Sequence, residues 1–265
     1  MCVTGATSGI GLETARALAL SGGRVIVAVR DAARGAAVVQ ELAAAGGQAE
    51  LLVADLASYT SVRQAATKLL ERHPALDVLV NNAGTVTRHR QVTGDGHERM
   101  WQTNFLGHVL LTRLLLGALR RGAAPRIVNV SSEAHRSGRI PWDDPELSKG
   151  FRPLRMYAQT KLAQVLYTRE LARREPAIAV TALHPGAIWT GIWKPAPAPL
   201  RWLLRLVLAP ADKGAPPVVR LAVATDVAGT SGVYFNRWKE AAPAPQAQDD
   251  AAAARLWDLA ERATA

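Results

Sequence analysis

Short apolar segments rich in β-branched residues alternate along the chain with longer segments whose apolar residues recur at helical spacing. This alternation predicts strands joined by helices, and therefore a parallel sheet with right-handed crossovers. Residues 25–29 read Val-Ile-Val-Ala-Val, an unbroken apolar run typical of a strand buried on both faces. The predicted strands are residues 1–4, 24–29, 49–54, 76–81, 125–131, 177–184 and 232–235.

Helical patterns fill the intervals between these strands. They cover residues 9–20, 32–45, 59–72, 98–121, 154–174 and 213–224, followed by a final helix at 249–262. The sequence therefore predicts an α/β fold in which residues 1–265 form one doubly wound, Rossmann-like domain. Its parallel sheet has about seven strands with helices on both faces. Residues 241–265, which begin with alternating Pro and Ala, are predicted to be a C-terminal tail that starts as an extended surface segment.

The composition, with 49% hydrophobic and 20% charged residues, is that of a globular protein. The net charge is +10, but basic residues occur singly or in pairs, so we expect no nucleic-acid partner. A single cysteine, Cys2, excludes an internal disulfide and fits a reducing compartment, while six scattered histidines predict no metal site.

We expect a cytoplasmic protein without a membrane span. Because the first strand must end near Thr4, either that strand is unusually short or a segment upstream of Met1, such as an anchor, is absent here.

Three glycines, Gly5, Gly9 and Gly11, follow the first strand and open the first helix. Their spacing differs from the usual dinucleotide fingerprint, but their position between a strand and a helix is the one such a motif needs. Glycines allow a tight turn, and a helix N-terminus offers unpaired N–H groups to a pyrophosphate. The turn therefore predicts a dinucleotide site that includes Gly5, Thr7, Ser8, Gly9, Ile10 and Gly11.

The residues at the end of the second strand bear on the choice of cofactor. A carboxylate there usually binds the ribose 2′-hydroxyl of NAD, whereas this chain has Val29 followed by Arg30 and Asp31. Asp31 can serve as that carboxylate or as the N-cap of the next helix, and we favour the N-cap. Arg30 is then free to bind a 2′-phosphate, so NADP(H) is predicted to be preferred over NAD(H).

Tyr157 and Lys161 lie four residues apart and so share one face of the predicted helix. An ammonium group beside a phenol favours the phenolate, so we expect the pKa of Tyr157 to fall from about 10 toward neutrality. A serine pair at the end of the strand 125–131 can reach the same place. Reduction of a ketone needs a proton donor and a hydrogen-bond partner for the oxygen, roles that suit Tyr157 and either Ser131 or Ser132.

Several motifs occur together in the order and spacing of the short-chain dehydrogenases/reductases, and the resemblance covers essentially the whole chain. They are Thr4-Gly-x-x-x-Gly-Ile-Gly11, Asp55-Leu56, Asn81-Asn-Ala-Gly84, Asn104, Val130-Ser-Ser132, Tyr157-x-x-x-Lys161 and Pro185-Gly186. The long interval between Ser132 and Tyr157, and the segment from Asn104 to Thr112, are most similar to the branch of retinol dehydrogenases and WW-domain oxidoreductases.

This resemblance implies roles for individual residues. Ser132, not Ser131, orients the substrate oxygen, and Lys161 binds the hydroxyls of the nicotinamide ribose. Asn104 kinks its helix and holds a water that links Lys161 to solvent, which makes Asn104, Ser132, Tyr157 and Lys161 the catalytic set. Further cofactor contacts are implied for Asp55, Leu56, Asn82, Ala83, Gly84, Tyr157, Lys161, Pro185, Gly186, Ile188 and Thr190. A homodimer or homotetramer, paired through the two helices that begin near Glu98 and Leu154, is expected by analogy.

Residues 190–210 contain Pro195, Pro197 and Pro199 and then an apolar run that ends before Pro210, and they resemble the substrate lid of this family. Trp189 and Trp193 are predicted to contact the substrate together with Ser132 and Tyr157, and Trp142 and Trp202 are expected to add apolar area near the cleft. Such a surface favours a lipophilic alcohol, aldehyde or ketone. The alternative, that the run packs on a partner or touches a membrane surface, stays equally open.

The sequence therefore predicts an NADP-dependent oxidoreductase that transfers hydride between the nicotinamide and a lipophilic alcohol, aldehyde or ketone. The alternatives are a catalytically idle NAD(P)-binding sensor and an interaction protein that binds through the apolar face of residues 200–209. His135 and His184 lie near the expected site, but no Gly-x-Ser-x-Gly elbow accompanies them, so we expect surface or packing roles. His108 is expected to be a satisfied core or interface histidine.

Overall fold

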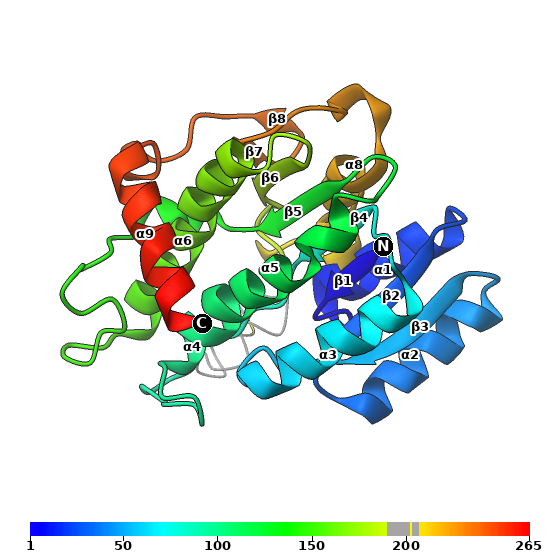
Figure 1. Ribbon diagram of the computed structural model, residues 1–265, viewed down its shortest axis with the longest axis horizontal. Helices are drawn as coiled ribbons and strands as arrows, with labels where there is room; N and C mark the ends of the chain where they lie inside the picture. Colours follow the sequence, from blue (N-terminus) through cyan, green and yellow to red (C-terminus); the bar gives the residue numbers. More distant parts are fainter. Residues whose placement is uncertain (190–201, 203–206) are drawn as a thin grey trace.

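The computed structural model describes residues 1–189, 202 and 207–265 (Figure 1). Eight strands in these residues form one sheet in the order β3-β2-β1-β4-β5-β6-β7-β8, and every neighbouring pair is parallel except β7 and β8. The strands are β1 (Cys2–Thr4), β2 (Arg24–Val29), β3 (Gln48–Val53), β4 (Val78–Asn81), β5 (Arg126–Val130), β6 (Ala179–His184), β7 (Val233–Asn236) and β8 (Lys239–Glu240).

Helices cover both faces of this sheet. The helices are α1 (Gly9–Leu20), α2 (Ala32–Ala44), α3 (Tyr59–Arg72), α4 (Arg99–Trp101), α5 (Gly107–Leu119), α6 (Pro153–Arg174), α8 (Ala215–Val223) and α9 (Asp250–Ala263). Apolar residues of α1, α2 and α8 belong to one buried cluster, and those of α3, α5, α6 and α9 belong to another. The sheet therefore separates two hydrophobic cores.

Alternation along the strands explains why both cores form. Val25, Val27 and Val29 of β2 lie in the cluster with α1, whereas Ile26 and Ala28 lie in the cluster with α5 and α6. Successive side chains of a strand point to opposite faces, so an unbroken apolar run places apolar groups on both. The predicted doubly wound parallel sheet is confirmed.

Three details differ from the sequence predictions. β8 was not predicted, because its two residues, Lys239 and Glu240, are exposed and carry no apolar pattern. The helix predicted over 98–121 is not one regular helix, because a π-helical turn at Gln102–Leu106 separates α4 from α5. The segment expected on the surface before the last helix also contributes to the interior, since Ala244 and Ala247 are buried.

The last helix, α9, lies along the outer side of α6 (Figure 1). The rings of Tyr167 on α6 and Trp257 on α9 stack with centroids 5.4 Å apart, and Arg174 lies over the Trp257 ring. Arg169 also pairs with Asp250 at 2.8 Å. As a result, residues 158–168 of α6 are all buried within one chain. Pairing of two copies through α5 and α6, as the resemblance implied, stays a prediction.

In the described part of the chain, no helix is both long enough and apolar enough to cross a bilayer.

We predict that Leu256→Ala in α9 lowers the free energy of unfolding by about 2–5 kcal/mol, since it removes a fully buried side chain from the larger core. Urea unfolding followed by circular dichroism measures this loss. The matched control is Leu154→Ala at the start of α6, where the side chain is 71% exposed and the change should stay within about 0.5 kcal/mol. Equal effects of the two substitutions would show that α9 does not stabilise the fold.

Candidate active site

The order of the strands places a topological switch point between the carboxyl ends of β1 and β4, where open α/β sheets form a ligand crevice. β1 is flanked by β2 and β4, so the chain winds outward in opposite directions from this pair. In open α/β sheets, ligands bind outside the carboxyl ends of the strands at such a switch point. The glycine turn follows β1 and the Asn82–Gly84 segment follows β4, so both predicted cofactor segments lie at the switch point.

The glycine turn is shaped by backbone conformation and by close approach. Gly5 and Gly9 have φ angles of +69° and +60°, a region that side-chain-bearing residues rarely adopt. A Cβ atom on Gly5 would lie 2.8 Å from the Cα of Ala83, and one on Gly11 would overlap the side-chain amide of Asn82. The turn is therefore pressed directly against the segment that follows β4.

Thr4 joins the two segments through hydrogen bonds. Its hydroxyl oxygen accepts from the backbone N–H groups of Asn82 at 2.9 Å and Ala83 at 3.0 Å. The side-chain amide of Asn82 donates in return to the Thr4 carbonyl at 2.8 Å. Thr4 was noted in the sequence only as the start of a motif, and this bracing role was missed.

The N-terminus of α1 fits a pyrophosphate group. Ser8 occupies the N-cap position, but its side chain makes no capping hydrogen bond. N–H groups in the first turn of a helix have no partner within the helix, and the helix dipole favours an anion beside them. Together with the glycine conformations, this arrangement fits the dinucleotide that the sequence predicts.

Two arginines lie at the start of α2, beside the glycine turn. Asp31 caps α2 by accepting from the backbone N–H of Arg34 at 3.0 Å, which confirms the N-cap interpretation. Arg30 is exposed, and the guanidinium of Arg34 donates to the carbonyl of Thr7 at 3.2 Å. Arg34 was missed by the sequence analysis, although it follows Arg30 by four residues.

Ser132, Tyr157 and Lys161 lie together beyond the end of β5. The Ser132 hydroxyl lies beside the Tyr157 hydroxyl, where it acts to lower the pKa of Tyr157, and both residues are partly exposed. The ammonium nitrogen of Lys161 lies 5.6 Å from the centre of the Tyr157 ring and is almost fully buried. Ser131 points elsewhere, because its hydroxyl donates to the Lys161 carbonyl at 2.9 Å. The geometry therefore selects Ser132 over Ser131 as the partner of Tyr157.

Burial dominates the electrostatics of this group. It lowers the pKa of Lys161 to about 7 and raises the pKa of Tyr157 to about 12, although the hydrogen bond from Ser132 acts to lower the latter. The sequence predicted the opposite direction for Tyr157, and for the protein's own groups that prediction is wrong. The reason is that the cost of burying the phenolate outweighs the effect of the hydrogen bond. Burial also disfavours the charged form of Lys161, so less positive charge is present to stabilise the phenolate.

Asn104 lies in the π-helical turn and is fully buried. Its side chain accepts from the backbone N–H of Thr85 at 2.8 Å and donates to the carbonyl of the same residue at 3.0 Å. It therefore fixes the segment directly after Gly84. The resemblance implied a helix irregularity at Asn104, and a π turn is present there. Thr85 was not singled out in the sequence.

The Asn104 carbonyl accepts from two side chains, the amide of Gln164 at 2.9 Å and the imidazole of His108 at 3.1 Å. π turns inside helices make main-chain groups available in this way. His108 is thus a satisfied core histidine, as expected. Gln164 was missed, although it follows Lys161 by three residues and so lies on the same face of the helix.

The remaining predicted cofactor residues lie around the same crevice. Asp55 follows β3 and accepts from the N–H of Ala57 at 2.9 Å, while Leu56 beside it is buried. Pro185 and Gly186 follow β6, and Gly186 has a φ of +112°. Ile10 of the glycine turn and Ile188 approach each other, since a Cβ on Gly214 would lie 2.9 Å from both side chains.

Some of the predicted cofactor and substrate contacts lie outside the described residues or away from the site. Thr190, Trp193 and most of the predicted lid lie outside the described residues. Trp189 is partly exposed, and its backbone N–H donates to the carbonyl of Ala209 at 2.8 Å. Trp142 packs beneath the guanidinium of Arg255 on α9 at 4.7 Å, so it secures the long insertion to the last helix. The expectation that Trp142 faces the cleft is therefore not supported.

A family model described as short chain dehydrogenase matches residues 1–200. The chain belongs to this family.

Relatives of this short-chain dehydrogenase include retinol dehydrogenase 14 of Mus musculus, which is 41% identical over 98% of this chain and 84% of the relative. The WW domain-containing oxidoreductase of Danio rerio is 40% identical over 98% of this chain and 67% of its own length. A crystal structure from Mycobacterium paratuberculosis has a TM-score of 0.82 and 35% identity, covering 99% of this chain and 92% of that one. The chain is therefore an oxidoreductase that acts on alcohol or carbonyl groups.

A solved complex also resembles this short-chain dehydrogenase. A short chain dehydrogenase from Burkholderia cenocepacia, solved with NADP, has a TM-score of 0.71 and 28% identity, covering 89% of this chain and 94% of that one.

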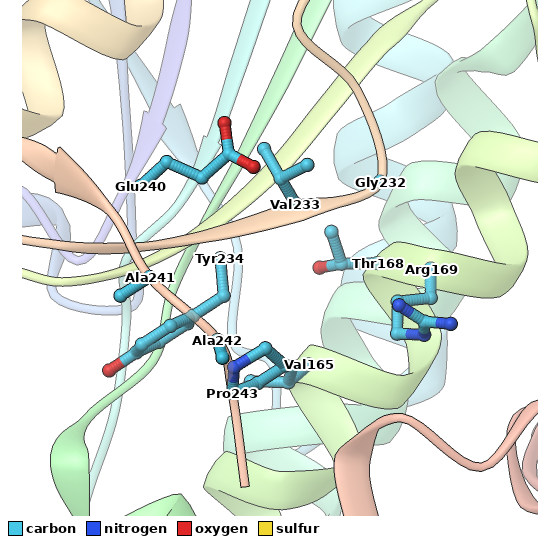
Figure 2. Close-up of a pocket in the computed structure, with 10 residues that line it drawn as sticks. All are labelled: Val165, Thr168, Arg169, Gly232, Val233, Tyr234, Glu240, Ala241, Ala242 and Pro243. Atoms are coloured by element: carbon cyan, nitrogen blue, oxygen red, sulfur yellow. The ribbon is translucent and has the colours of Figure 1, made fainter. Parts of the chain in front are cut away.

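A separate cavity of about 420 Å³ lies between α6 and the segment around β7 and β8 (Figure 2). Val165 and Thr168 line it from α6, opposite Tyr234 and residues 240–243. None of its lining residues belongs to the group formed by Ser132, Tyr157 and Lys161. In this short-chain dehydrogenase the cavity is therefore distinct from the candidate active site.

Two histidines lie near the candidate site of this dehydrogenase, and His135 supports the structure around Ser132. The Nδ1 atom of His135 lies 2.7 Å from the Ser132 carbonyl, and its Nε2 accepts from the N–H of Ala244 at 3.1 Å. His135 is fully buried, so the packing role expected from the sequence is supported. His184, at the end of β6, is partly exposed, and burial lowers its pKa.

Proposed function

We propose that this chain transfers hydride between a nicotinamide cofactor, preferably NADP(H), and a lipophilic alcohol, aldehyde or ketone. The observation that carries the proposal is that Ser132 and Tyr157, two partly exposed residues, lie beside each other and beside the buried ammonium of Lys161. Two neighbouring hydroxyls can share one substrate oxygen, which is what carbonyl reduction and alcohol oxidation need.

The cofactor is assigned to the crevice at the switch point. The uncapped start of α1 and the turn from Gly5 to Gly11 would hold the pyrophosphate. Arg30 and Arg34 would bind a 2′-phosphate, because guanidinium groups match phosphate geometry. When bound, the nicotinamide supplies or accepts the hydride. The remaining contacts are proposed for Asp55 and Leu56, Asn82 to Gly84, Tyr157 and Lys161, Pro185 and Gly186, Ile188 and Thr190.

The protonation states of the protein's own groups favour Tyr157 as an acid at neutral pH. Since the pKa of Tyr157 is raised to about 12, its hydroxyl keeps its proton and can donate it to a carbonyl oxygen. Ser132 holds the same oxygen from the other side. Alcohol oxidation needs the Tyr157 hydroxyl to lose its proton, so we expect oxidation to speed up as the pH rises.

The printed names of the relatives support a lipophilic substrate. Two of them are retinol dehydrogenases 13 and 14, and retinol is a lipophilic alcohol. Trp189 is partly exposed next to the bridge between Ile188 and Ala209, and Trp202 and Val207 beyond it are largely exposed. These side chains would offer the apolar contact that such a molecule needs.

We predict that the purified chain oxidises NADPH with retinaldehyde, and with hydrophilic aldehydes far more slowly. Tyr157→Phe should lower kcat for retinaldehyde by about 10² to 10⁴-fold, while NADPH still binds, since only the proton donor is lost. Absorbance at the nicotinamide band gives turnover, and cofactor fluorescence gives binding.

The matched control is Tyr167→Phe on the same helix, whose hydroxyl has no hydrogen-bond partner in the described residues. It should keep near-normal turnover. Retained turnover in Tyr157→Phe would refute the acid assignment, and a preference for hydrophilic aldehydes would refute the lipophilic substrate.

The cofactor preference predicts a lower KM for NADPH than for NADH. Arg30→Ala and Arg34→Ala should each raise the KM for NADPH roughly tenfold and leave that for NADH nearly unchanged, because each removes a charged partner of the 2′-phosphate. Steady-state kinetics with both cofactors measure this. The control is Arg24→Ala, an exposed arginine at the opposite end of the same strand β2. Equal KM values for both cofactors, or an unchanged KM for NADPH in both variants, would contradict the preference.

A further inference from the structure

The side chain of Gln164 connects the ammonium group of Lys161 to the main chain of the π turn. The Lys161 nitrogen donates to the Gln164 side-chain oxygen at 3.0 Å, and the Gln164 side-chain nitrogen donates to the Asn104 carbonyl at 2.9 Å. Gln164 is only 3% exposed. The proposed reaction assigns no role to Gln164.

The orientation of this amide is fixed by its two neighbours. An ammonium group can only donate and a main-chain carbonyl can only accept. If the Gln164 amide were turned over, its N–H groups would face Lys161 and its oxygen would face the Asn104 carbonyl, leaving both contacts repulsive. The contact is therefore available in one orientation only, and an ammonium group donates to the Gln164 oxygen more strongly than a neutral amine does.

The Asn104 carbonyl extends this connection to the cofactor crevice. His108 lies 3.1 Å from it through Nδ1, and burial lowers the pKa of His108 to about 4, so the ring is neutral. Since a carbonyl only accepts, the ring proton must be on Nδ1, and Nε2 then accepts from the Thr4 hydroxyl at 3.0 Å. A buried hydrogen-bonded chain thus runs from Lys161 through Gln164, Asn104 and His108 to Thr4.

Lys161 has few other groups that can stabilise its charge. Its second acceptor is the Val130 carbonyl at 2.8 Å. The titratable groups that face it are Tyr157 on its own helix and His108 on α5, and both are neutral at pH 7. Within the described residues, burial is the only cause of the lowered pKa of Lys161, and no carboxylate acts to raise this pKa. The stabilisation of the ammonium form therefore depends on two neutral oxygen atoms.

We propose that Gln164 is a positioning residue that holds the side chain of Lys161 in place and favours its charged form. The role in catalysis rests on the function proposed above, but the effect on Lys161 itself does not. Gln164 also lies on the line between Lys161 and the Asn104 carbonyl, where the family resemblance implied a water. A neutral amide keeps its own protons, so Gln164 offers Lys161 a hydrogen-bond acceptor and does not relay a proton to Asn104.

The test measures the pKa of Lys161 directly, by NMR of chains labelled with ¹³C at lysine Cε. The chain has only six lysines, so the signals are few, and Lys161→Met assigns the one that matters. Gln164→Met should lower the pKa of Lys161 by about one unit, because an acceptor for the charged form is lost. Gln164→Leu carries the same expectation should Gln164→Met fail to fold.

The matched control is Gln159→Met, which removes another buried amide of α6 that donates to the Pro145 carbonyl and makes no contact with Lys161. It should leave the pKa of Lys161 unchanged. An unchanged pKa in the Gln164 variant, or an equal shift in the control, would overturn the proposal.

A second readout separates this proposal from the proposed function. If Lys161 acts in the reaction as its ammonium form, the alkaline limb of kcat/KM for retinaldehyde reduction should move to lower pH in Gln164→Met, by the same amount as the pKa measured by NMR. A shift seen by NMR without a shift of this limb would uphold the role of Gln164 toward Lys161 and refute the role of Lys161 in the reaction.

Discussion

The burial of one ammonium group constrains the rest of this site. Lys161 is only 3% exposed, and the atoms that accept from it are the Val130 carbonyl and the Gln164 amide, both neutral. Moving a charge out of water is costly unless hydrogen bonds replace the lost hydration. The end of β5, the face of α6 and the π turn at Asn104 must therefore stay in register for Lys161 to hold any charge. The result is a lysine whose pKa lies near neutrality.

The site divides its groups by exposure. Ser132 and Tyr157 are partly exposed, whereas Lys161, Asn104 and Gln164 are buried and held by hydrogen bonds. The residues proposed to contact the substrate are thus partly exposed, and the residues that position them are buried away from water. Electrostatic interactions are stronger in such a water-poor interior, and the supporting groups need no rearrangement when charge develops. The switch point of the sheet brings the glycine turn to the same crevice.

Much of the fold follows from local pattern. The apolar runs predicted the strands because both faces of the sheet are buried, and the glycines predicted the turn because Gly5 and Gly9 need positive φ angles. The i and i+4 spacing placed Tyr157 and Lys161 on one face. The pKa of Tyr157 was predicted in the wrong direction, since the degree of burial is a tertiary property that spacing does not report. Gln164 and Arg34 were missed for a related reason, because the Asn104 carbonyl that Gln164 binds and the Thr7 carbonyl that Arg34 binds lie far away in the sequence, on other elements of the fold. Similarly, the long apolar pattern of α6 did not reveal that α9 covers it.

The most direct test of the account is a crystal structure of the chain with NADP and a bound carbonyl analogue. The account predicts the Lys161 nitrogen within about 3 Å of the nicotinamide ribose hydroxyls, and one oxygen of the analogue within hydrogen-bonding distance of both the Ser132 and the Tyr157 hydroxyls. A complex in which the ribose does not contact Lys161, or in which the Tyr157 hydroxyl faces away from the nicotinamide, would contradict it.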